Sequence, residues 1–253
     1  MKRKREMERK TEIKSAIEEL SLLIKLTTRN KNNINSNTIA TTAAATGVGA
    51  AGADHLKQQQ IQQELVVSNI PTRPFLSICS LIIQVLDKIG PTMAVMRQDI
   101  DKNIQRVEML CDTDPTTYSN LVEILNKEAV ERCAKKGDTC SKALVWLTRS
   151  LDFTAALLEK LIGEPRENME QIVGKSYETT LKPWHGWISS AAYKVALKLV
   201  PDTDTFISLL MDKGQNIDTF KDEIQAFISL LVPLLEDLHS TLSSYGLEKL
   251  KST

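Results

Sequence analysis

The sequence predicts an all-α protein in which about eight helices pack in two layers. Apolar residues recur at helical spacing from about residue 56 onward, and glycine or proline separates the helical stretches. The strand-like alternation and the Asn-Gly or Asp-Gly turns that mark β-hairpins do not occur in the sequence. Helices that are this apolar on one side must pack against one another, which favours two layers.

Residues 1–53 differ from the rest of the chain in composition. Residues 1–28 are charged and carry an apolar repeat at helical spacing, which predicts a short amphipathic helix. Residues 29–53 are rich in Asn, Thr, Ala and Gly, so we expect a flexible linker with too little apolar surface to offset chain entropy. The apolar positions of the predicted helix are Ile13, Ile17, Leu20 and Ile24.

We therefore divide the chain into an N-terminal extension (residues 1–54), a connecting segment (55–71) and a helical domain (72–253). Within the domain, Gly174 weakens the fifth helix, Pro183 is expected to begin the sixth, and Pro233 is expected to kink the last one. The expected helical segments, in order, are residues 75–90, 91–111, 114–137, 139–163, 168–182, 183–200, 202–214 and 216–246.

Composition excludes several classes of protein. The formal net charge is zero, so no overall field attracts nucleic acid. No apolar run approaches the roughly 20 residues that span a bilayer. The four cysteines form no CxxC pair, which predicts reduced thiols in the cytosol rather than a zinc site.

Signatures of enzymes are also missing. The sequence contains no GxGxxG, no phosphate-binding GxxxxGK[ST], no HExxH and no GxSxG motif. The three histidines lie far apart on different predicted elements. We expect no catalytic residues, no metal site and no cofactor.

A polar stripe runs along the helix that contains RQDIDKNIQRVEML. Asp99, Asn103 and Arg106 recur at helical spacing, one residue out of phase with an apolar face. That face consists of Ile100, Ile104 and Val107. Spacing alone leaves two interpretations open, a solvated surface or a polar binding site at the rim of the core.

Aromatic residues stand out at two other places. Trp146 shares a helix face with Arg149, and this spacing favours a core Trp beside a surface Arg. His185, in PWHGW, is expected in the first turn of a helix, where it either caps the helix or binds a ligand. An indole platform combined with carboxylate, amide and guanidinium groups is the chemistry that binds sugars.

These positions resemble the headgroup signature of the glycolipid transfer protein family. In that family an Asp, an Asn four residues later and a Lys or Arg three residues further share one helix. A Trp within WL-x-R and a His within HGW follow. The matching residues here are Asp99, Asn103, Arg106, Trp146 and His185. The resemblance covers residues 72–253, and KGQNID near residue 215 resembles a late loop of the family.

The resemblance implies a helical sandwich that encloses an apolar tunnel beneath a surface headgroup site. Trp146 would stack on the first sugar, and the polar stripe would bind its hydroxyls. Asp99 would also accept from the ceramide amide, while His185 would donate to the acyl carbonyl. Trp187 would dock on the bilayer, and Tyr193 would line the tunnel.

By the same resemblance, the chain would bind a glycosphingolipid (a glycosylceramide) and carry it through the cytosol without energy input. It would touch membranes only transiently. In a related branch that carries ceramide phosphate, an Arg replaces the Trp and a Lys replaces the Asn. Trp146 and Asn103 therefore favour a sugar headgroup, although Lys142, one turn before Trp146, adds positive charge.

Two alternatives remain open at this stage. One is transfer of ceramide phosphate, and the other is a lipid sensor or adaptor that binds sphingolipid without net transfer. The N-terminal extension bears on the second, because a simple shuttle does not need it. The extension is a candidate for binding a protein partner or an anionic membrane.

Overall fold

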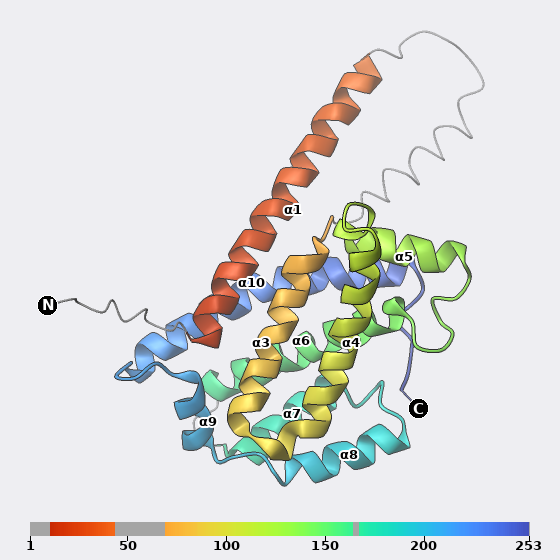
Figure 1. Cartoon of the computed structure of the whole chain (residues 1–253). Helices are drawn as coiled ribbons and strands as arrows, with labels where there is room; N and C mark the ends of the chain where they lie inside the picture. Colours follow the sequence, from red (N-terminus) through yellow and green to blue (C-terminus); the bar gives the residue numbers. More distant parts are fainter. Residues whose placement is uncertain (1–10, 44–68, 164–166, 253) are drawn as a thin grey trace, which may run out of the picture.

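The computed structural model describes residues 11–43, 69–163 and 167–252, with the side chains of residues 28–43 left out. Within these ranges the regular secondary structure is helical, with one isolated bridge between Pro71 and Asn120 (Figure 1). The predicted all-α fold is confirmed. The α-helices are α1 (Glu12–Ala43), α3 (Thr72–Ile89), α4 (Ala94–Thr113), α5 (Leu121–Val130), α6 (Cys140–Gly163), α7 (Met169–Thr180), α8 (Trp187–Leu197), α9 (Thr203–Leu210) and α10 (Ile217–Ser244).

The helices form two layers. Helices α3 and α4 pack side by side in one layer, and α6, α7 and α10 lie behind them in the other (Figure 1). Helix α4 packs on α6, which also contacts α7 and α10, so α6 joins the layers. Helices α5 and α9 pack at the edges, on α6 and α3, and α8 contacts α7.

The core lies between the layers and follows the helical periodicity. On α6, Leu144, Leu147 and Leu151 recur at i, i+3 and i+7 and are buried. Phe75 on α3 and Phe220 on α10 are among the largest buried side chains. Burying each such side chain stabilises the fold by roughly 1.5–3 kcal/mol, which is enough for packing to dominate helix propensity.

The N-terminal helix differs from the prediction. Helix α1 spans 32 residues and continues to Ala43, so residues 29–43 are helical rather than a flexible linker. That stretch contains no Gly or Pro, and extending an existing helix requires only one residue to be ordered at a time. Residues 44–53 of the predicted linker, and the predicted boundary at residue 54, lie outside the described residues.

The first half of α1 packs into the core. Its buried residues contact α3 and α10, while its second half extends past the other helices (Figure 1). The buried apolar residues of α1 are Ile13, Ala16, Leu20 and Leu23.

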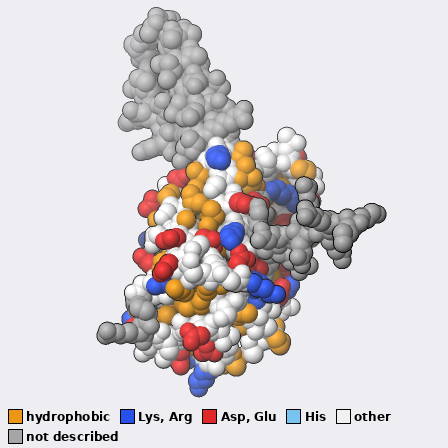
Figure 2. All heavy atoms as spheres, turned by 90° about the vertical axis from the view of Figure 1, so that its left-hand side faces the viewer, with side chains coloured by type: hydrophobic (Ala, Val, Ile, Leu, Met, Phe, Trp, Pro, Cys, Tyr) orange, Lys and Arg blue, Asp and Glu red, His pale blue; other side chains and the backbone are white. Residues whose placement is uncertain are grey.

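Ion pairs fix the start of α1 to its neighbours. Glu12 pairs with Lys88 at the end of α3, and Lys14 pairs with Asp212 after α9. Lys14 also lies 3.6 Å from Glu223 on α10. Figure 2, a view of the side on which α1, α9 and the start of α10 lie, shows acidic and basic side chains interspersed around apolar ones. The charged side chains at the start of α1 are therefore part of its packing interface with the domain.

Helix starts follow local side-chain caps in most places. Asn168 and Gln171 form a capping box that supports α7 despite Gly174, and Asn216 caps α10. Helices α3, α4 and α8 start without a side-chain cap, and α8 begins at Trp187 with Gly186 as its N-cap, not at Pro183. His185 therefore precedes α8 instead of lying in its first turn, and this position corrects the prediction.

Candidate functional site

The polar stripe on α4 is already hydrogen-bonded within itself. The side chain of Asn103 is only 8% exposed and donates from Nδ2 to the carbonyl oxygen of Asp99 at 3.0 Å. Arg106 donates from Nη1 to Oδ1 of Asn103 at 3.1 Å. Asp99 lies at the surface one turn earlier. The stripe thus presents a carboxylate, an amide that already makes two hydrogen bonds, and a guanidinium in a fixed order along the helix.

Arg106 lies where α4 meets the start of α6. Its guanidinium is 3.6 Å from the carboxylate of Asp138, in the loop before α6, and its carbonyl accepts from Sγ of Cys140 at 3.4 Å. The buried carboxylate of Glu128 accepts from the backbone N–H groups of Cys140 and Ser141. Helix α6 is therefore anchored beside the polar stripe, and Trp146 lies about 9 Å further along it.

The structure brings Trp146 and His185 together, although they are on different elements. Their ring centroids are 5.7 Å apart, with an angle of 43° between the planes. Both residues are half-buried. An aromatic face beside an imidazole is therefore available at the surface, next to the α4–α6 junction.

Sequence reasoning missed Tyr177, which lies behind His185. The phenol oxygen of this buried tyrosine on α7 is 3.2 Å from Nδ1 of His185 and 3.3 Å from Oγ of Ser190. Its ring stacks on that of Tyr193, which is half-buried against the core. Tyr177 precedes His185 by eight residues, across the end of a helix, so periodicity gave no signal for this contact.

The predicted environment of Arg149 is reversed in the structure. Arg149 is only 4% exposed, whereas Trp146 is half-buried, so the pair is not a core Trp beside a surface Arg. The guanidinium lies 4.8 Å from the ring centroid of Trp146 and 4.2 Å from that of Trp184. It also donates to the carbonyls of Glu248 and Leu250, which replace water.

Desolvation by neighbouring groups shifts the pKa of two residues of the site, half-buried His185 and Asp99 at the surface. Desolvation lowers the pKa of His185 below its ordinary value, and the positive charge of Arg149 lowers it further. The imidazole is therefore neutral at pH 7, with one donor and one acceptor nitrogen. Desolvation raises the pKa of Asp99 above its ordinary value, while Lys102 and Arg106 lower it.

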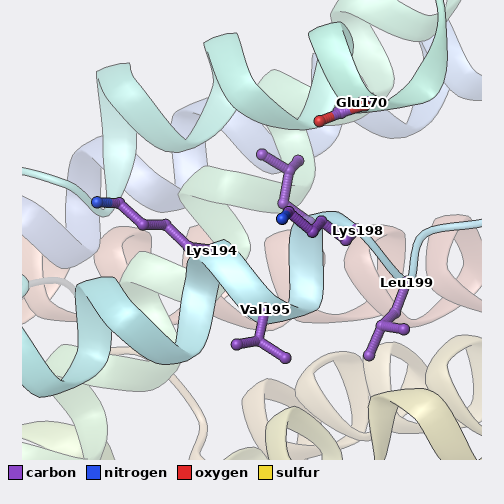
Figure 3. Close-up of a pocket in the computed structure, with 6 residues that line it drawn as sticks. Glu170, Lys194, Val195, Lys198 and Leu199 are labelled. Atoms are coloured by element: carbon purple, nitrogen blue, oxygen red, sulfur yellow. The ribbon is translucent and has the colours of Figure 1, made fainter.

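A surface pocket lies apart from these residues. It has a volume of about 470 Å³ and lies between the start of α7 and the second half of α8 (Figure 3). None of the five predicted headgroup residues lines it. The lining residues are Glu170, Lys194, Val195, Leu197, Lys198 and Leu199.

Comparison with known proteins assigns the family. A family model described as glycolipid transfer protein (GLTP) matches residues 70–212. The chain belongs to the glycolipid transfer protein family. Glycolipid transfer protein 3 of Arabidopsis thaliana is 50% identical over 259 aligned residues, covering all of both chains. Glycolipid transfer protein 2 of the same plant is 47% identical over 255 residues, again covering all of both chains.

Solved structures of the GLTP fold agree with the architecture. The FAPP2 structure that describes selection of simple glycosphingolipids has a TM-score of 0.67 and 25% identity, and it covers 74% of this chain and 91% of its own. Arabidopsis accelerated-cell-death 11 bound to C12 ceramide-1-phosphate has a TM-score of 0.63 at 20% identity, with 74% and 91% covered. The two-layer GLTP architecture is thus shared with lipid-binding proteins.

Within the described residues, the predicted site residues fall into two linked groups. The first is the stripe of Asp99, Asn103 and Arg106 on α4. The second is the pair of Trp146 and His185, with α6 joining the two groups. The same part of the chain contains no group of three or more potential metal ligands and no helix long and apolar enough to cross a membrane.

Proposed function

We propose that this protein binds a glycosphingolipid and transfers it between membranes. The observation that carries the proposal is the half-buried indole of Trp146 on α6, with its ring centroid 5.7 Å from that of His185. Helix α6 packs on α4, the helix that carries the Asp99–Asn103–Arg106 stripe. An indole face suits the C–H side of a sugar ring, and the stripe supplies partners for hydroxyl groups. Membership of the glycolipid transfer protein family supports the same function.

In this proposal each site residue has a distinct role. Trp146 stacks on the first sugar, while Asn103 and Arg106 exchange their mutual hydrogen bond for bonds to sugar hydroxyls. Asp99 accepts from the ceramide amide N–H, and neutral His185 donates to the acyl carbonyl. All five side chains would then face one headgroup at the α4–α6 junction.

A sugar headgroup fits the site better than a bare phosphate. Only Arg106 among the five residues carries a permanent positive charge, and Asp138 already lies 3.6 Å from it. A phosphate needs several charge-assisted donors, whereas an indole platform offers none. We therefore propose glycosylceramide as the cargo and treat ceramide phosphate as the alternative outcome of the test.

The lipid chains require an apolar interior. Exposing them to water costs about 0.8 kcal/mol per CH₂, so a tunnel between the layers would lower the barrier to exchange. In this proposal the partly buried apolar residues that pack against the core, Tyr193 among them, would line the tunnel. No covalent bond changes, so the proposed function needs neither a catalytic group nor a cofactor.

We propose that α8 docks on the membrane. Trp187 is 80% exposed, and four further residues on or just after α8 form an exposed apolar stripe beside it. In Figure 3, Val195 and Leu199 of this stripe point to the same side of α8. Exposed Trp and aliphatic side chains suit the membrane interface. The residues of the stripe are Ile188, Ala192, Val195 and Leu199.

We place the protein in the cytosol, in transient contact with membranes. All four cysteines are free thiols, as a reducing compartment requires. The first half of α1 packs on α3 and α10, so a protein partner at the N-terminal extension would have to bind beyond that part of the helix. The function proposed therefore rests on the lipid alone.

Transfer between vesicles tests the proposal. Donor vesicles carry either glucosylceramide or ceramide-1-phosphate, and movement to acceptor vesicles is followed with and without the protein. We expect rapid transfer of glucosylceramide and little transfer of ceramide-1-phosphate. Faster transfer of ceramide-1-phosphate would contradict the headgroup assignment, and absence of transfer with tight lipid binding would point to a sensor. Mass spectrometry of lipid that co-purifies with the protein provides an independent check.

A further inference from the structure

The segment that follows α10, residues 247–252, is hydrogen-bonded to Arg149 and to the backbone on both sides of His185. Leu247 is buried in the core and fixes the start of the segment. Arg149 then donates from Nη2 to the carbonyl of Glu248 at 2.8 Å and from Nη1 to that of Leu250 at 2.7 Å. One side chain of α6 thus holds two carbonyls of this segment, two residues apart.

The same guanidinium lies between two indoles. Trp146 is on one helix and Trp184 is in the loop before α8, and the guanidinium carbon is within 5 Å of both ring centroids, at 4.8 and 4.2 Å. A cation against an aromatic face is attracted by the ring, and more strongly where water is excluded. Arg149 therefore connects the indole of the headgroup site, the loop that carries His185 and the 247–252 segment.

Ser252 completes the contact on the other side of His185. Its N–H donates to the carbonyl of Trp184 at 2.9 Å, and its hydroxyl oxygen accepts from the N–H of Gly186 at 2.9 Å. These two bonds flank His185 in the sequence. The backbone on both sides of the imidazole is thus fixed by a residue 66 or more positions away.

We propose that the 247–252 segment positions the headgroup site, with Arg149 orienting Trp146 and Ser252 orienting His185. Both are positioning residues, since neither is placed in contact with the lipid. The inference rests on the proposed function, because it assumes that these two rings meet the headgroup. A loosely held ring loses orientation and binds less tightly, so the segment would set the affinity of a site formed by other elements.

The hydroxyl of Ser252 allows a minimal test. Ser252→Ala removes the acceptor of the Gly186 N–H, Ser252→Thr keeps it, and Lys251→Ala changes an exposed neighbour on the same segment. Affinity for a short-chain glucosylceramide is measured by calorimetry, and the midpoint of urea unfolding is measured alongside. We expect Ser252→Ala to bind about three- to tenfold more weakly with a midpoint close to that of the wild type, while both other variants bind normally.

A spectroscopic readout separates positioning from general stability. In the free protein, Ser252→Ala should shift or broaden the imidazole signals of His185. Arg149→Lys, which cannot bridge both carbonyls, should do the same to the indole N–H signals of Trp146 and Trp184. Wild-type affinity and unchanged ring signals in Ser252→Ala would overturn the proposal. So would a loss of affinity matched by an equal loss of stability.

The design also distinguishes the two proposals. If the wild type binds no glycosylated ceramide, the proposed function fails. The ring signals of the variants would still show whether the segment orients Trp146 and His185. If the wild type binds and Ser252→Ala binds equally well, only the positioning role fails.

Discussion

The phenol oxygen of Tyr177 lies 3.2 Å from Nδ1 of His185, so a buried tyrosine on α7 is a hydrogen-bond partner of the imidazole before α8. In neutral imidazole, the partner of one nitrogen decides whether the other is donor or acceptor. The phenol has one proton, which it gives to either Oγ of Ser190 or Nδ1 of His185. When it donates to Nδ1, the imidazole proton resides on Nε2. That tautomer is the one that can donate to an acyl carbonyl.

Replacing Tyr177 with Phe should therefore weaken binding of lipids that carry the ceramide amide. The loss of one hydrogen bond corresponds to about a three- to tenfold lower affinity. Calorimetry with a short-chain glucosylceramide measures it. Tyr245→Phe is a matched control, because its hydroxyl bonds Asn126 elsewhere in the fold. A complex in which nitrogen NMR places the proton on Nδ1 would rule out the proposed donor role of His185.

Trp146→Ala and Trp187→Ala should separate lipid recognition from membrane contact. Loss of the indole at position 146 should abolish glucosylceramide transfer, because the sugar loses its stacking platform. Loss of the 80% exposed indole at position 187 should leave binding of a short-chain lipid intact but reduce vesicle binding and slow transfer. Vesicle pelleting and transfer rates measure the two effects. Equal effects of both changes on binding would contradict this division.

Helix α1 should contribute to the stability of the domain. Leu20 and Leu23 are 0% and 1% exposed in the same core as α3 and α10, so Leu20→Ala should cost about 2–5 kcal/mol of unfolding free energy. Leu22, which is 49% exposed on the same helix, is the control, and Leu22→Ala should change stability by no more than about 0.5 kcal/mol. Urea unfolding measures both. Equal values would mean that α1 does not pack on the domain in solution.

The buried carboxylate of Glu128 should stabilise the start of α6. It accepts from the N–H groups of Cys140 and Ser141 at 2.8 and 2.7 Å, two donors that lack partners in the helix. Glu128→Gln keeps one good acceptor, so we expect a loss of roughly 1–3 kcal/mol in the free energy of unfolding. Glu123→Gln, at an exposed position of the same helix α5, should have little effect. An unchanged free energy of unfolding in Glu128→Gln would show that other groups satisfy these donors.

Two histidines should give stability opposite dependences on pH. Burial lowers the pKa of His185, so the unfolded chain binds the proton more readily and stability falls as pH drops below the ordinary value of about 6.5. His239 donates from Nε2 to the carboxylate of Asp152 at 2.9 Å, and this hydrogen bond raises the pKa of His239. His239 therefore adds stability below about pH 6.5 that is lost as pH rises through the raised value.

The two effects separate in single variants. Both variants keep the same carboxylates, so the difference between them reports the two histidines. His239→Gln should therefore lose more stability than His185→Gln when pH is lowered from about 7 to about 5. Urea midpoints across this range measure the difference. The reverse order would contradict the assigned directions.

The helical spacing in the sequence was sufficient to predict most of the fold. Ile100, Ile104 and Val107 are buried on α4 as predicted, because a period of 3.6 residues places them on one face. The same spacing placed Asp99 and Asn103 on a neighbouring stripe. It did not indicate that Asn103 would be buried and bonded to its own helix, since exposure depends on how closely α6 approaches.

Two errors show where local pattern fails. Arg149 is buried because two carbonyls from residues about 100 positions later and two indoles replace its water. Helix α8 begins at Trp187 instead of Pro183, and Ser252 binds the N–H of its capping Gly186. In both cases the deciding partners come from residues distant in the sequence.

The sequence by itself determined the all-α class, the apolar faces of the helices and the identity of the five candidate headgroup residues. These properties depend on side chains within a few turns of one helix and on a short motif. Only the tertiary structure decided that Trp146 meets His185 and that Tyr177 lies behind His185. It also decided that Ser252 of the 247–252 segment bonds the backbone on both sides of His185. Those contacts join elements far apart in the chain, where neither periodicity nor spacing constrains which groups meet.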